Sequence, residues 1–571
     1  MKRTLLALLC PIVAAAAPKY APWIEPDFPF FSTTLDLRDA KPDSVPMNVT
    51  PRGLVLNLGN GAWACFDVDL LRVAAMWTGN GVTPEALGPL SYQETGNHKT
   101  LGGQVKLPKP AGPLLLVNGI YPGWQVGERV SLEDPREPQP SVEEPGRGPL
   151  PENVARFKTL RIADRGVVLD YTVAGALVQE TITAAKHDGA PIVQRHFRLA
   201  PCEQPRLLVL GSRKAKGAEA SVLLSGATML DHADAWIVRV PAETREFSVS
   251  ISHASATPPA LTVRPVTPLA APRWPQEITT NVTLSTAKDA YIVDDIAPPF
   301  ANPWRRNVRL CDVAFFKDGT AAASTFDGDV WLIRGLATTQ GKATWKRFTS
   351  GLHEPMSIAI RDEQLFAFDR NGIWRLLDTD GNGEADVHEL FSNAFPQSGE
   401  TREFPNSLKV APDGSFVIAK GGQQDSTISK LNGSVLRVAA DGKSYSVLGT
   451  GFRQPYAGVN PKTGLVTAGD QEGQYTPTSP LYILKEPAEF HGFLSALLPK
   501  EEYPAPIAEP LTWIPHQVNA SAISQTWLYG AKMGVLNESL IHVGFNRPEL
   551  FRVMLNNRAS RPQAAVVSWL R

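Results

Sequence analysis

The stretch VAFFKDGTAAAS, residues 313–324, consists of two apolar runs joined by an Asp-Gly turn. Apolar runs joined by a tight turn return in SIAIRDEQLFAF (357–368), LKVAPDGSFVIA (408–419) and AGVNPKTGLVTA (457–468). Asp-Gly and Pro-Asp-Gly turns supply the positive φ that a hairpin bend requires. Each stretch therefore predicts a pair of antiparallel strands.

A second kind of strand follows these hairpins after a spacer. Its copies are DVWLIRG (329–335), GIWRLLD (372–378), SVLRVAADG (434–442), PLYILKE (480–486) and LFRVMLN (550–556). The hairpin turns recur with a period of roughly 45 to 50 residues, which is the length of a four-stranded propeller blade. The pattern favours a β-propeller over the alternative, an ordinary meander or sandwich.

The earlier part of the chain has a different texture. It is rich in Pro, Gly and β-branched residues, and its apolar runs have strand lengths. We predict an all-β chain, with a β-sandwich-like N-terminal module over residues 18–297 and a propeller over residues 298–571. The repeats number four, with a fifth from about Pro504, as in a six-bladed type of propeller reduced to about five blades. The final run QAAVVSWLR (563–571) has no terminating turn, which favours a truncated gene product over a ring closed by another element.

Residues 1–17 have the form of a secretory signal peptide, with a Lys-Arg start, an apolar run and a small-residue stretch. A lipoprotein signal, with Cys10 as the lipidated residue, is the alternative. Because a cleaved signal peptide directs export, we expect a periplasmic or secreted protein, and no other stretch is long and apolar enough to be a membrane span. The net charge of −1, with 20% charged residues spread evenly, gives no indication of a nucleic-acid partner.

The segment DTDGNGEADVHE (378–389) has the spacing of a twelve-residue calcium loop. The predicted ligands are the side chains of Asp378, Asp380, Asn382, Asp386 and Glu389, and the backbone carbonyl of Glu384. Strand-like sequence flanks the loop, so Ca²⁺ is expected to staple a connection within a blade and not to form an active site. A solvated acidic turn is the alternative interpretation.

Three stretches carry a family resemblance: 351–391, which includes GLHEPMSIAIRDEQLFAFDRNGIWRLLD, FPNSLKVAPDGSFVIAKGG (404–422) and GFRQPYAGVNPKTGLVTAGDQEG (451–473). They resemble the glucose/sorbosone dehydrogenase-like propellers of large secreted bacterial haem-binding proteins. The first half, in PRGLVLNLGNGAWACFDVDLLRVAAMWTGNGVTPEALGPLSY (51–92) and NGIYPGWQ (118–125), is similar to the uncharacterised module that precedes such propellers.

The resemblance implies a six-bladed propeller that binds the quinone cofactor PQQ over its channel and oxidises a sugar by hydride transfer to it, with a histidine base. GFRQPYAG matches a family motif, which makes Arg453 and Gln454 candidate cofactor contacts, although Gln454 replaces an Asn. The catalytic histidine is absent, and TREFPNS (401–407) has Arg402 and Glu403 in its place.

The candidate bases are therefore Glu403, which would need a raised pKa, and His353, whose position at the start of an inner strand faces the channel mouth. His516 occupies a similar place in the fifth repeat. A hydrogen bond to a loop carbonyl is the alternative role for either histidine. Arg402 and Lys420 are further candidates for binding an anionic cofactor.

Two functions remain open. The first is an exported PQQ-type sugar dehydrogenase that passes electrons to a c-type cytochrome. The second is a non-catalytic propeller and sandwich protein that binds carbohydrate or a partner. The sequence contains no Cys-x-x-Cys, so covalent haem is not expected in this chain. The aromatics of the N-terminal module, such as Trp63 and Trp124, either stack on sugars or pack in a core.

Overall fold

The chain folds almost entirely into antiparallel β-strands, which confirms the predicted all-β class. The computed structural model describes residues 25–570 except 26, 41–47, 84–106, 138–145, 216–217, 219, 255–257, 259–265, 270, 337–340, 400–401, 423–430, 474–475, 493–505, 520, 531 and 557–560. The predicted signal peptide, residues 1–17, lies outside these ranges, as does Cys10. Among the described residues no helix has the length and apolar character needed to cross a bilayer.

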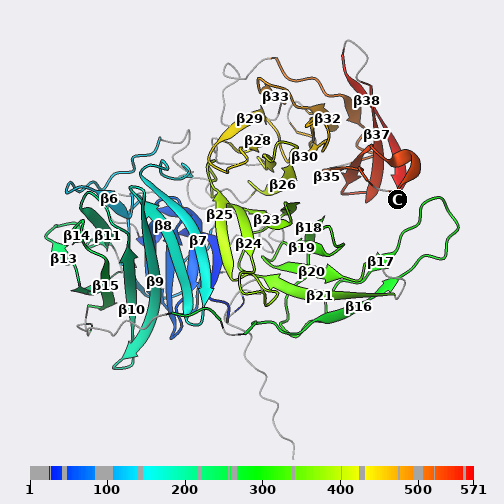
Figure 1. Ribbon diagram of the computed structural model, residues 1–571. Coiled ribbons are helices and arrows are strands. Elements are labelled where there is room, and N and C mark those ends of the chain that lie inside the picture. The colour runs from blue at the N-terminus through cyan, green and yellow to red at the C-terminus, as the bar shows by residue number, and fades with distance from the viewer. Residues whose placement is uncertain are drawn as a thin grey trace, which may run out of the picture.

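The described residues of the N-terminal half form three sheets (Figure 1). The first runs β1 (Phe30–Asp36), β2 (Val49–Asn57), β3 (Ala62–Asp67), β4 (Arg72–Thr78) and β5 (Leu114–Val117). The second runs β13 (Thr228–Leu230), β14 (Ala235–Val240), β11 (Arg206–Ser212) and β6 (Trp124–Val126). The third contains β12 (Ala220–Ser225), β15 (Glu246–His253), β10 (Ala190–Leu199), β9 (Ala176–His187), β8 (Gly166–Val173) and β7 (Ala155–Ala163).

These sheets face one another across a shared apolar core, as in a β-sandwich. Phe66 of the first sheet, Leu208 of the second and Leu169 of the third all belong to it. Trp63 and Trp124 are also buried, so they serve packing and are not available to stack on a sugar. Burying one large apolar side chain contributes about 1.5–3 kcal/mol, so this core stabilises the module.

Among the described residues, five successive groups of four antiparallel strands follow, which we call propeller sheets 1 to 5, and strands from other segments extend the first three. Sheet 1 contains β18 (Leu310–Phe315), β19 (Ala321–Thr325), β20 (Val330–Arg334) and β21 (Lys342–Thr349). Sheet 2 contains β22 (Ser357–Arg361), β23 (Gln364–Asp369), β24 (Gly372–Leu377) and β25 (Val387–Ser392). Sheet 3 contains β26 (Pro405–Val410), β27 (Phe416–Lys420), β28 (Ser434–Val438) and β29 (Tyr445–Thr450), with β33 (Glu489–Phe490) added at its edge. Sheet 4 contains β30 (Tyr456–Val459), β31 (Val466–Gly469), β32 (Ser479–Ile483) and β34 (Thr512–Ile514). Sheet 5 contains β35 (Ala522–Trp527), β36 (Leu540–Gly544), β37 (Glu549–Asn556) and β38 (Gln563–Leu570).

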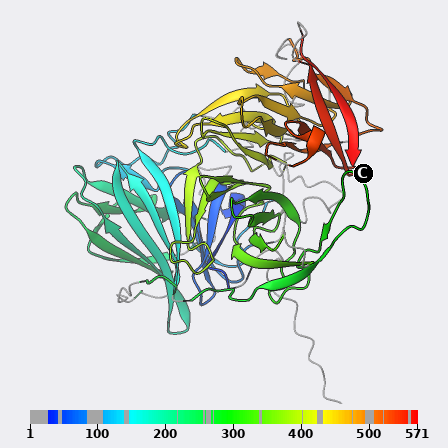
Figure 2. The same ribbon diagram turned by 45° about the vertical axis from the view of Figure 1, so that its right-hand side comes forward.

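The first strand of each propeller sheet contacts the first strand of the next, from β18 through β22, β26 and β30 to β35. The sheets therefore fan out around their first strands, which is the arrangement of a β-propeller (Figure 2). The predicted turns join the first and second strands, with Gly319 and Gly414 at φ of 86° and 80°. The number of blades in a complete ring stays a prediction.

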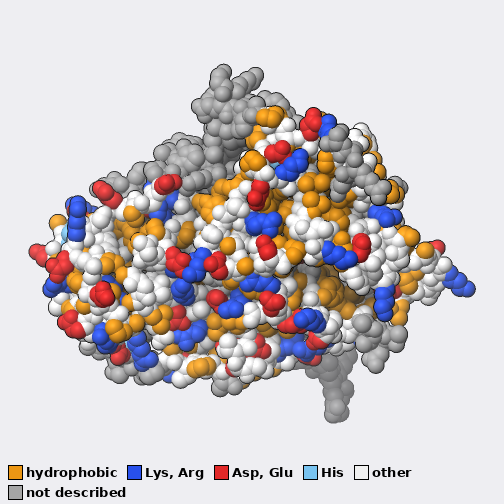
Figure 3. Space-filling view, turned by 45° about the horizontal axis from the view of Figure 1, so that its top comes forward, with side chains coloured by type: hydrophobic (Ala, Val, Ile, Leu, Met, Phe, Trp, Pro, Cys, Tyr) orange, Lys and Arg blue, Asp and Glu red, His pale blue; other side chains and the backbone are white. Residues whose placement is uncertain are grey.

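The two halves share one continuous sheet. Strand β7 of the N-terminal half pairs with β25, the last strand of propeller sheet 2, which gives a sheet of ten strands (Figure 1). Strand β16 (Ile278–Thr283), which lies in the range predicted for the N-terminal module, pairs with β21 and, through β17 (Asp295–Ile296), extends propeller sheet 1. Charged side chains of both signs are interspersed over the face shown in Figure 3.

Candidate functional site

The predicted site residues lie at one end of the propeller because of its strand order. In an antiparallel sheet, the start of the first strand and the end of the second strand lie at the same end of the sheet. His353, Glu403 and Arg453 precede first strands, whereas Lys420 ends a second strand. We call the end of the propeller formed by these loops the channel-mouth face.

In propeller sheets 2 and 4, a buried carboxylate at the end of the second strand bonds to the loop before the first strand; we call this place the corner of the sheet. Asp470, directly after β31, accepts hydrogen bonds from the backbone N–H groups of Arg453 (2.8 Å) and Gln454 (2.7 Å). Asp369, at the end of β23, likewise accepts from the backbone N–H of His353 (2.9 Å). Burial raises the pKa of both carboxyl groups to about 7, and the backbone N–H groups oppose this rise only in part. Each Asp thus ties the loop before a first strand to the end of the second strand.

Propeller sheet 3 reverses the charge at this corner. Lys420 occupies the position in sheet 3 that Asp369 occupies in sheet 2. Each residue directly follows one that pairs with a serine of the first strand, Ala419 with Ser407 and Phe368 with Ser357. The carboxylate comes instead from the preceding loop, where Glu403 Oε1 lies 2.5 Å from Lys420 Nζ. Neither side chain is exposed. Burial lowers the pKa of Lys420, and the neighbouring Glu403 opposes this change.

The remaining polar atoms of this pair also bond within the protein. Glu403 Oε2 accepts a hydrogen bond from the backbone N–H of Ser398 (2.9 Å), and Lys420 Nζ donates to the carbonyl of Pro396. Glu403 and Lys420 therefore satisfy each other and their neighbours. In this arrangement neither presents a group to a ligand at the channel-mouth face.

His353 and Gln454 are also internal. The His353 ring is buried, and burial, together with Arg370, holds its pKa well below the usual range, so the imidazole is neutral. Its Nδ1 has no hydrogen-bond partner among the described residues. Gln454 donates from Nε2 to the carbonyl of Arg402 (3.0 Å) and accepts at Oε1 from Asn406 (3.0 Å). Gln454 thus links the loops of sheets 3 and 4, while Arg402 itself is half-buried.

Three partly exposed side chains meet at the channel-mouth face of sheets 4 and 5. Arg453 Nη1 donates to the carbonyl of Glu472 (2.7 Å) and lies 3.6 Å from its Oε1. His516, in the loop between β34 and β35, has its Nδ1 4.0 Å from Glu472 Oε2. The exposed fractions of the Arg453, Glu472 and His516 side chains are 23%, 35% and 58%. A cation, a carboxylate and an imidazole therefore meet near the surface, with Oε2 of Glu472 itself buried and without a hydrogen-bond partner among the described residues.

The calcium loop connects β24 to β25. Oxygen atoms of Asp378, Asp380 and Asp386 lie within 4.8 Å of one another, a donor set that suits a hard cation such as Ca²⁺. Asp378 accepts hydrogen bonds from the backbone N–H groups of Gly381 (2.8 Å) and Gly383 (2.8 Å), which shapes the loop.

The other predicted ligands of this loop have protein partners. Asn382 Nδ2 donates to Asp380 Oδ2 (2.9 Å), and Glu389 on β25 is paired with Arg375 on β24. The Glu384 carboxylate accepts from the backbone N–H groups of Arg273 and Trp274, both at 2.7 Å, whereas its carbonyl was the predicted ligand. The structure thus brings three of the four predicted carboxylate ligands together, whereas the fourth, Glu389, is paired with Arg375.

This loop lies at the junction of the two halves. The contacts of Glu384 hold the segment at Arg273 and Trp274, which leads toward propeller sheet 1. The carbonyl of Asp386 accepts from the backbone N–H of Ile162 on β7 (2.8 Å). An ordered loop here therefore supports the pairing of β7 with β25.

Comparisons with known proteins give one family match and several structural likenesses. Residues 64–180 match the model of a domain of unknown function, DUF6797. No curated protein matches the sequence. Among solved structures, the chain is similar to a putative oxidoreductase (glucose dehydrogenase) from Thermus thermophilus, at 17% identity and a TM-score of 0.34, over 46% of this chain and 84% of that chain.

The chain is also similar to two further solved structures. The soluble aldose sugar dehydrogenase of Escherichia coli, in the apo-form, has 12% identity and a TM-score of 0.36, over 46% of this chain and 86% of that chain. An auxiliary nutrient binding protein from Bacteroides ovatus has 8% identity and a TM-score of 0.22, over 63% of this chain and 66% of that chain.

Sequence reasoning missed the residues that organise the channel-mouth face. Asp369, Asp470 and Glu472 each lie at or just after the end of a second strand, the place where Lys420 was singled out. A comparison of the residue at the end of the second strand across all the repeats would have identified Asp369 and Asp470. Glu472 has no such signal, because its contacts with Arg453 and His516 come from other loops.

Proposed function

We propose that this chain is an exported propeller protein that binds a sugar or a related polar small molecule at the channel-mouth face. The cluster of Arg453, Glu472 and His516 carries the proposal, because these are partly exposed polar groups from three different loops. A sugar offers hydroxyl groups that accept from a guanidinium and donate to a carboxylate. Export is supported by the signal-peptide pattern of residues 1–17.

Glu403 and Lys420 are bonded to each other inside the protein, which favours binding over catalysis. Both predicted bases, His353 and Glu403, are buried, and Glu403 is ion-paired to Lys420. Of the four predicted contacts to the quinone, Lys420 and Gln454 use their polar groups inside the protein. Among the described residues, the four predicted contacts therefore do not form a binding site for PQQ.

A second candidate function, sugar oxidation, is favoured by one observation. His516 is the exposed imidazole at this face, and Glu472 lies beside it. In that case His516 would accept the proton of a sugar hydroxyl, Glu472 would orient the imidazole and balance its charge, and a bound redox cofactor would have to take up the hydride from the same sugar carbon. The motif resemblance at Arg453 supports the same interpretation.

Isothermal titration of the purified chain with neutral aldoses and oligosaccharides tests the binding proposal. Binding is expected to weaken by about tenfold or more in Arg453→Ala and Glu472→Gln, because each removes a charge-assisted hydrogen bond. Lys462→Ala is the matched control, since Lys462 lies in a hairpin turn at the opposite end of propeller sheet 4. Equal loss in the control, or no binding by the unaltered chain, would overturn the proposal.

An assay with PQQ, Ca²⁺ and an artificial electron acceptor separates the two candidates. Sugar binding without turnover supports the binding function. Turnover that His516→Ala abolishes, while Lys462→Ala retains it, replaces the binding function with the oxidoreductase.

A further inference from the structure

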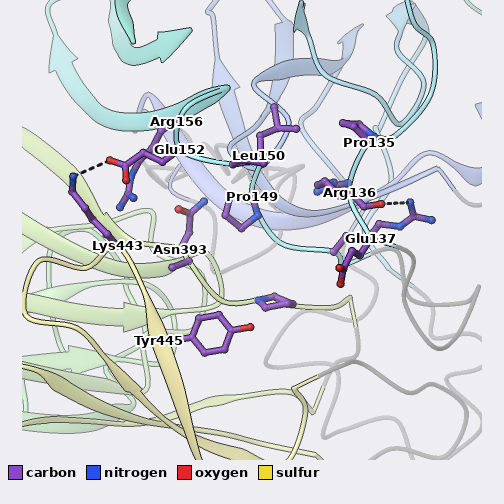
Figure 4. Close-up of a pocket in the computed structure, with 14 residues that line it drawn as sticks. Pro135, Arg136, Glu137, Pro149, Leu150, Glu152, Arg156, Asn393, Lys443 and Tyr445 are labelled. Atoms are coloured by element: carbon purple, nitrogen blue, oxygen red, sulfur yellow. Dashed lines mark hydrogen bonds and ion pairs between the residues drawn. The ribbon is translucent and has the colours of Figure 1, made fainter. Parts of the chain in front are cut away.

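A second cleft lies where the N-terminal half meets the outer strands of propeller sheets 2 and 3. Its volume is about 400 Å³, within the range of small-ligand sites, which often occur at domain interfaces. In Figure 4, Leu150, Glu152 and Arg156 form one wall. Lys443 and Tyr445, at the start of β29, form the other. The cleft shares no lining residue with the Arg453, Glu472 and His516 cluster.

One end of the cleft is rigid. The Arg136 guanidinium makes two hydrogen bonds of 2.9 Å to the Asp134 carboxylate and one of 2.6 Å to the carbonyl of Gly148. Arg147 lies 3.4 Å from the same carboxylate and donates to the carbonyl of Arg136. These contacts hold the pocket wall in place without help from a ligand, so the cleft is pre-organised.

At the other end of the cleft, two cationic side chains make fewer or weaker contacts within the protein. Arg156 donates from Nη2 to the carbonyl of Phe391 (3.2 Å), and among the described residues its other N–H groups are left for a ligand. Lys443 Nζ lies 3.1 Å from Glu152 Oε1, and both side chains are about half exposed, so this surface pair is readily exchanged. Counting Asp134, the cleft holds four cations, Arg136, Arg147, Arg156 and Lys443, against three carboxylates, Asp134, Glu137 and Glu152.

We propose that this cleft binds a uronic acid, a sugar that carries a carboxylate on its ring. Arg156 and Lys443 take the carboxylate, and Glu152, released from Lys443, accepts hydrogen bonds from hydroxyl groups. The Tyr445 ring, which projects into the space below Pro149, packs against the apolar face of the sugar (Figure 4). The mixed lining favours a monoanion, because the carboxylates repel a multiply charged phosphate.

The ligand would contact both halves of the chain at once. Arg156 belongs to β7, whereas Tyr445 begins β29 of propeller sheet 3 and Lys443 lies in the turn before it. A uronate is therefore expected to stabilise the folded junction as well as to bind.

Isothermal titration with galacturonate, tri-galacturonate and neutral galactose tests the proposal, in the Arg453→Ala variant so that binding of sugars at the channel-mouth face does not contribute. Binding of at least one uronate at millimolar or lower concentration is expected, falling as salt is raised, with galactose weaker by about tenfold or more. Stronger binding of the trimer identifies an acidic polysaccharide as the source, and equal binding identifies the free sugar. Equal binding of galactose, or no binding of either uronate, overturns the proposal.

Variants locate the site. Lys443→Ala and Arg156→Ala are each expected to weaken uronate binding by about tenfold. Arg165→Ala is the matched control, because it removes one cation from the turn after β7 without lining the cleft. Since Arg156 also contacts Phe391, circular dichroism and the melting temperature of each variant show that it is folded. Unchanged affinity in folded Lys443→Ala, or an equal loss in Arg165→Ala, contradicts the assignment.

Discussion

Glu403 and Lys420 form an ion pair of 2.5 Å in which neither side chain is exposed to solvent. The pair occupies the corner that Asp369 and Asp470 close in the neighbouring sheets with a carboxylate and backbone N–H groups. A lysine in the place of the aspartate would leave a buried positive charge, and the preceding loop compensates with Glu403. The pair thus has a structural role that its residue types alone do not reveal.

Breaking this pair is expected to destabilise the propeller strongly. Glu403→Gln leaves the Lys420 charge buried and unpaired, which costs about 3–5 kcal/mol of the free energy of unfolding. The double variant Glu403→Leu with Lys420→Met removes both charges and is expected to recover much of that loss. Denaturant unfolding of the three proteins measures it. A single variant as stable as the unaltered chain would show that the pair is not buried in solution.

The calcium loop predicts a metal-dependent melting temperature. Chelation with EDTA is expected to lower it by a few degrees, because a ligand of the folded state stabilises that state. Asp380→Ala removes one of the three clustered carboxylates and is expected to make the melting temperature independent of Ca²⁺. Asp318→Ala, in the hairpin turn of sheet 1, is the control that keeps the response. No effect of EDTA would leave the solvated acidic turn as the correct interpretation.

The buried aspartates predict a specific pH dependence of stability. Burial raises the pKa of Asp470 from 3.8 to about 7, so the folded state binds this proton more readily than the unfolded state. The contribution of Asp470 is complete below about pH 4 and is lost as the pH rises through about 7. Asp470→Asn should therefore show a smaller fall in the free energy of unfolding across this window.

A surface aspartate supplies the control for this measurement. Ser415 holds the pKa of Asp413 below its usual value, so Asp413 titrates below the window and Asp413→Asn should follow the unaltered chain within it. Denaturant unfolding at a series of pH values gives the slopes. Parallel curves for Asp470→Asn and the unaltered chain would show that Asp470 does not titrate there.

Arg52 predicts coupled unfolding of the two halves. On β2 it bonds to Asp69 (3.1 Å) and donates to the carbonyls of Asn393 (3.0 Å) and Phe395 (2.6 Å), which follow β25. Arg52→Met leaves the Asp69 carboxylate buried without this cation, and we expect a loss of about 3–5 kcal/mol and a separation of the thermal transitions of the two halves. Calorimetry measures both, with the exposed Arg198→Met as the control. An unchanged thermogram would contradict the coupling.

Local sequence predicted the elements well for a physical reason. The Asp-Gly turns and the apolar runs of 313–324 and 408–419 act over neighbouring residues, and they form hairpins in the structure at Gly319 and Gly414. The calcium-loop spacing is local as well, and three of its carboxylates do come together. Repetition of such local signals was sufficient to predict a propeller.

Contacts between distant segments had no comparable signal. In the pairing of β7 with β25, Leu160 lies opposite His388, and the sequence of neither strand indicates which strand it pairs with. The sequence determined that Glu403, Lys420 and Arg453 lie at strand ends near the channel mouth. Only the tertiary structure decided that the first two neutralise each other in the interior while Arg453 meets Glu472 and His516 near solvent. The reason is that turns and strands depend on adjacent residues, whereas the burial and charge partner of a polar side chain depend on segments brought together only by folding.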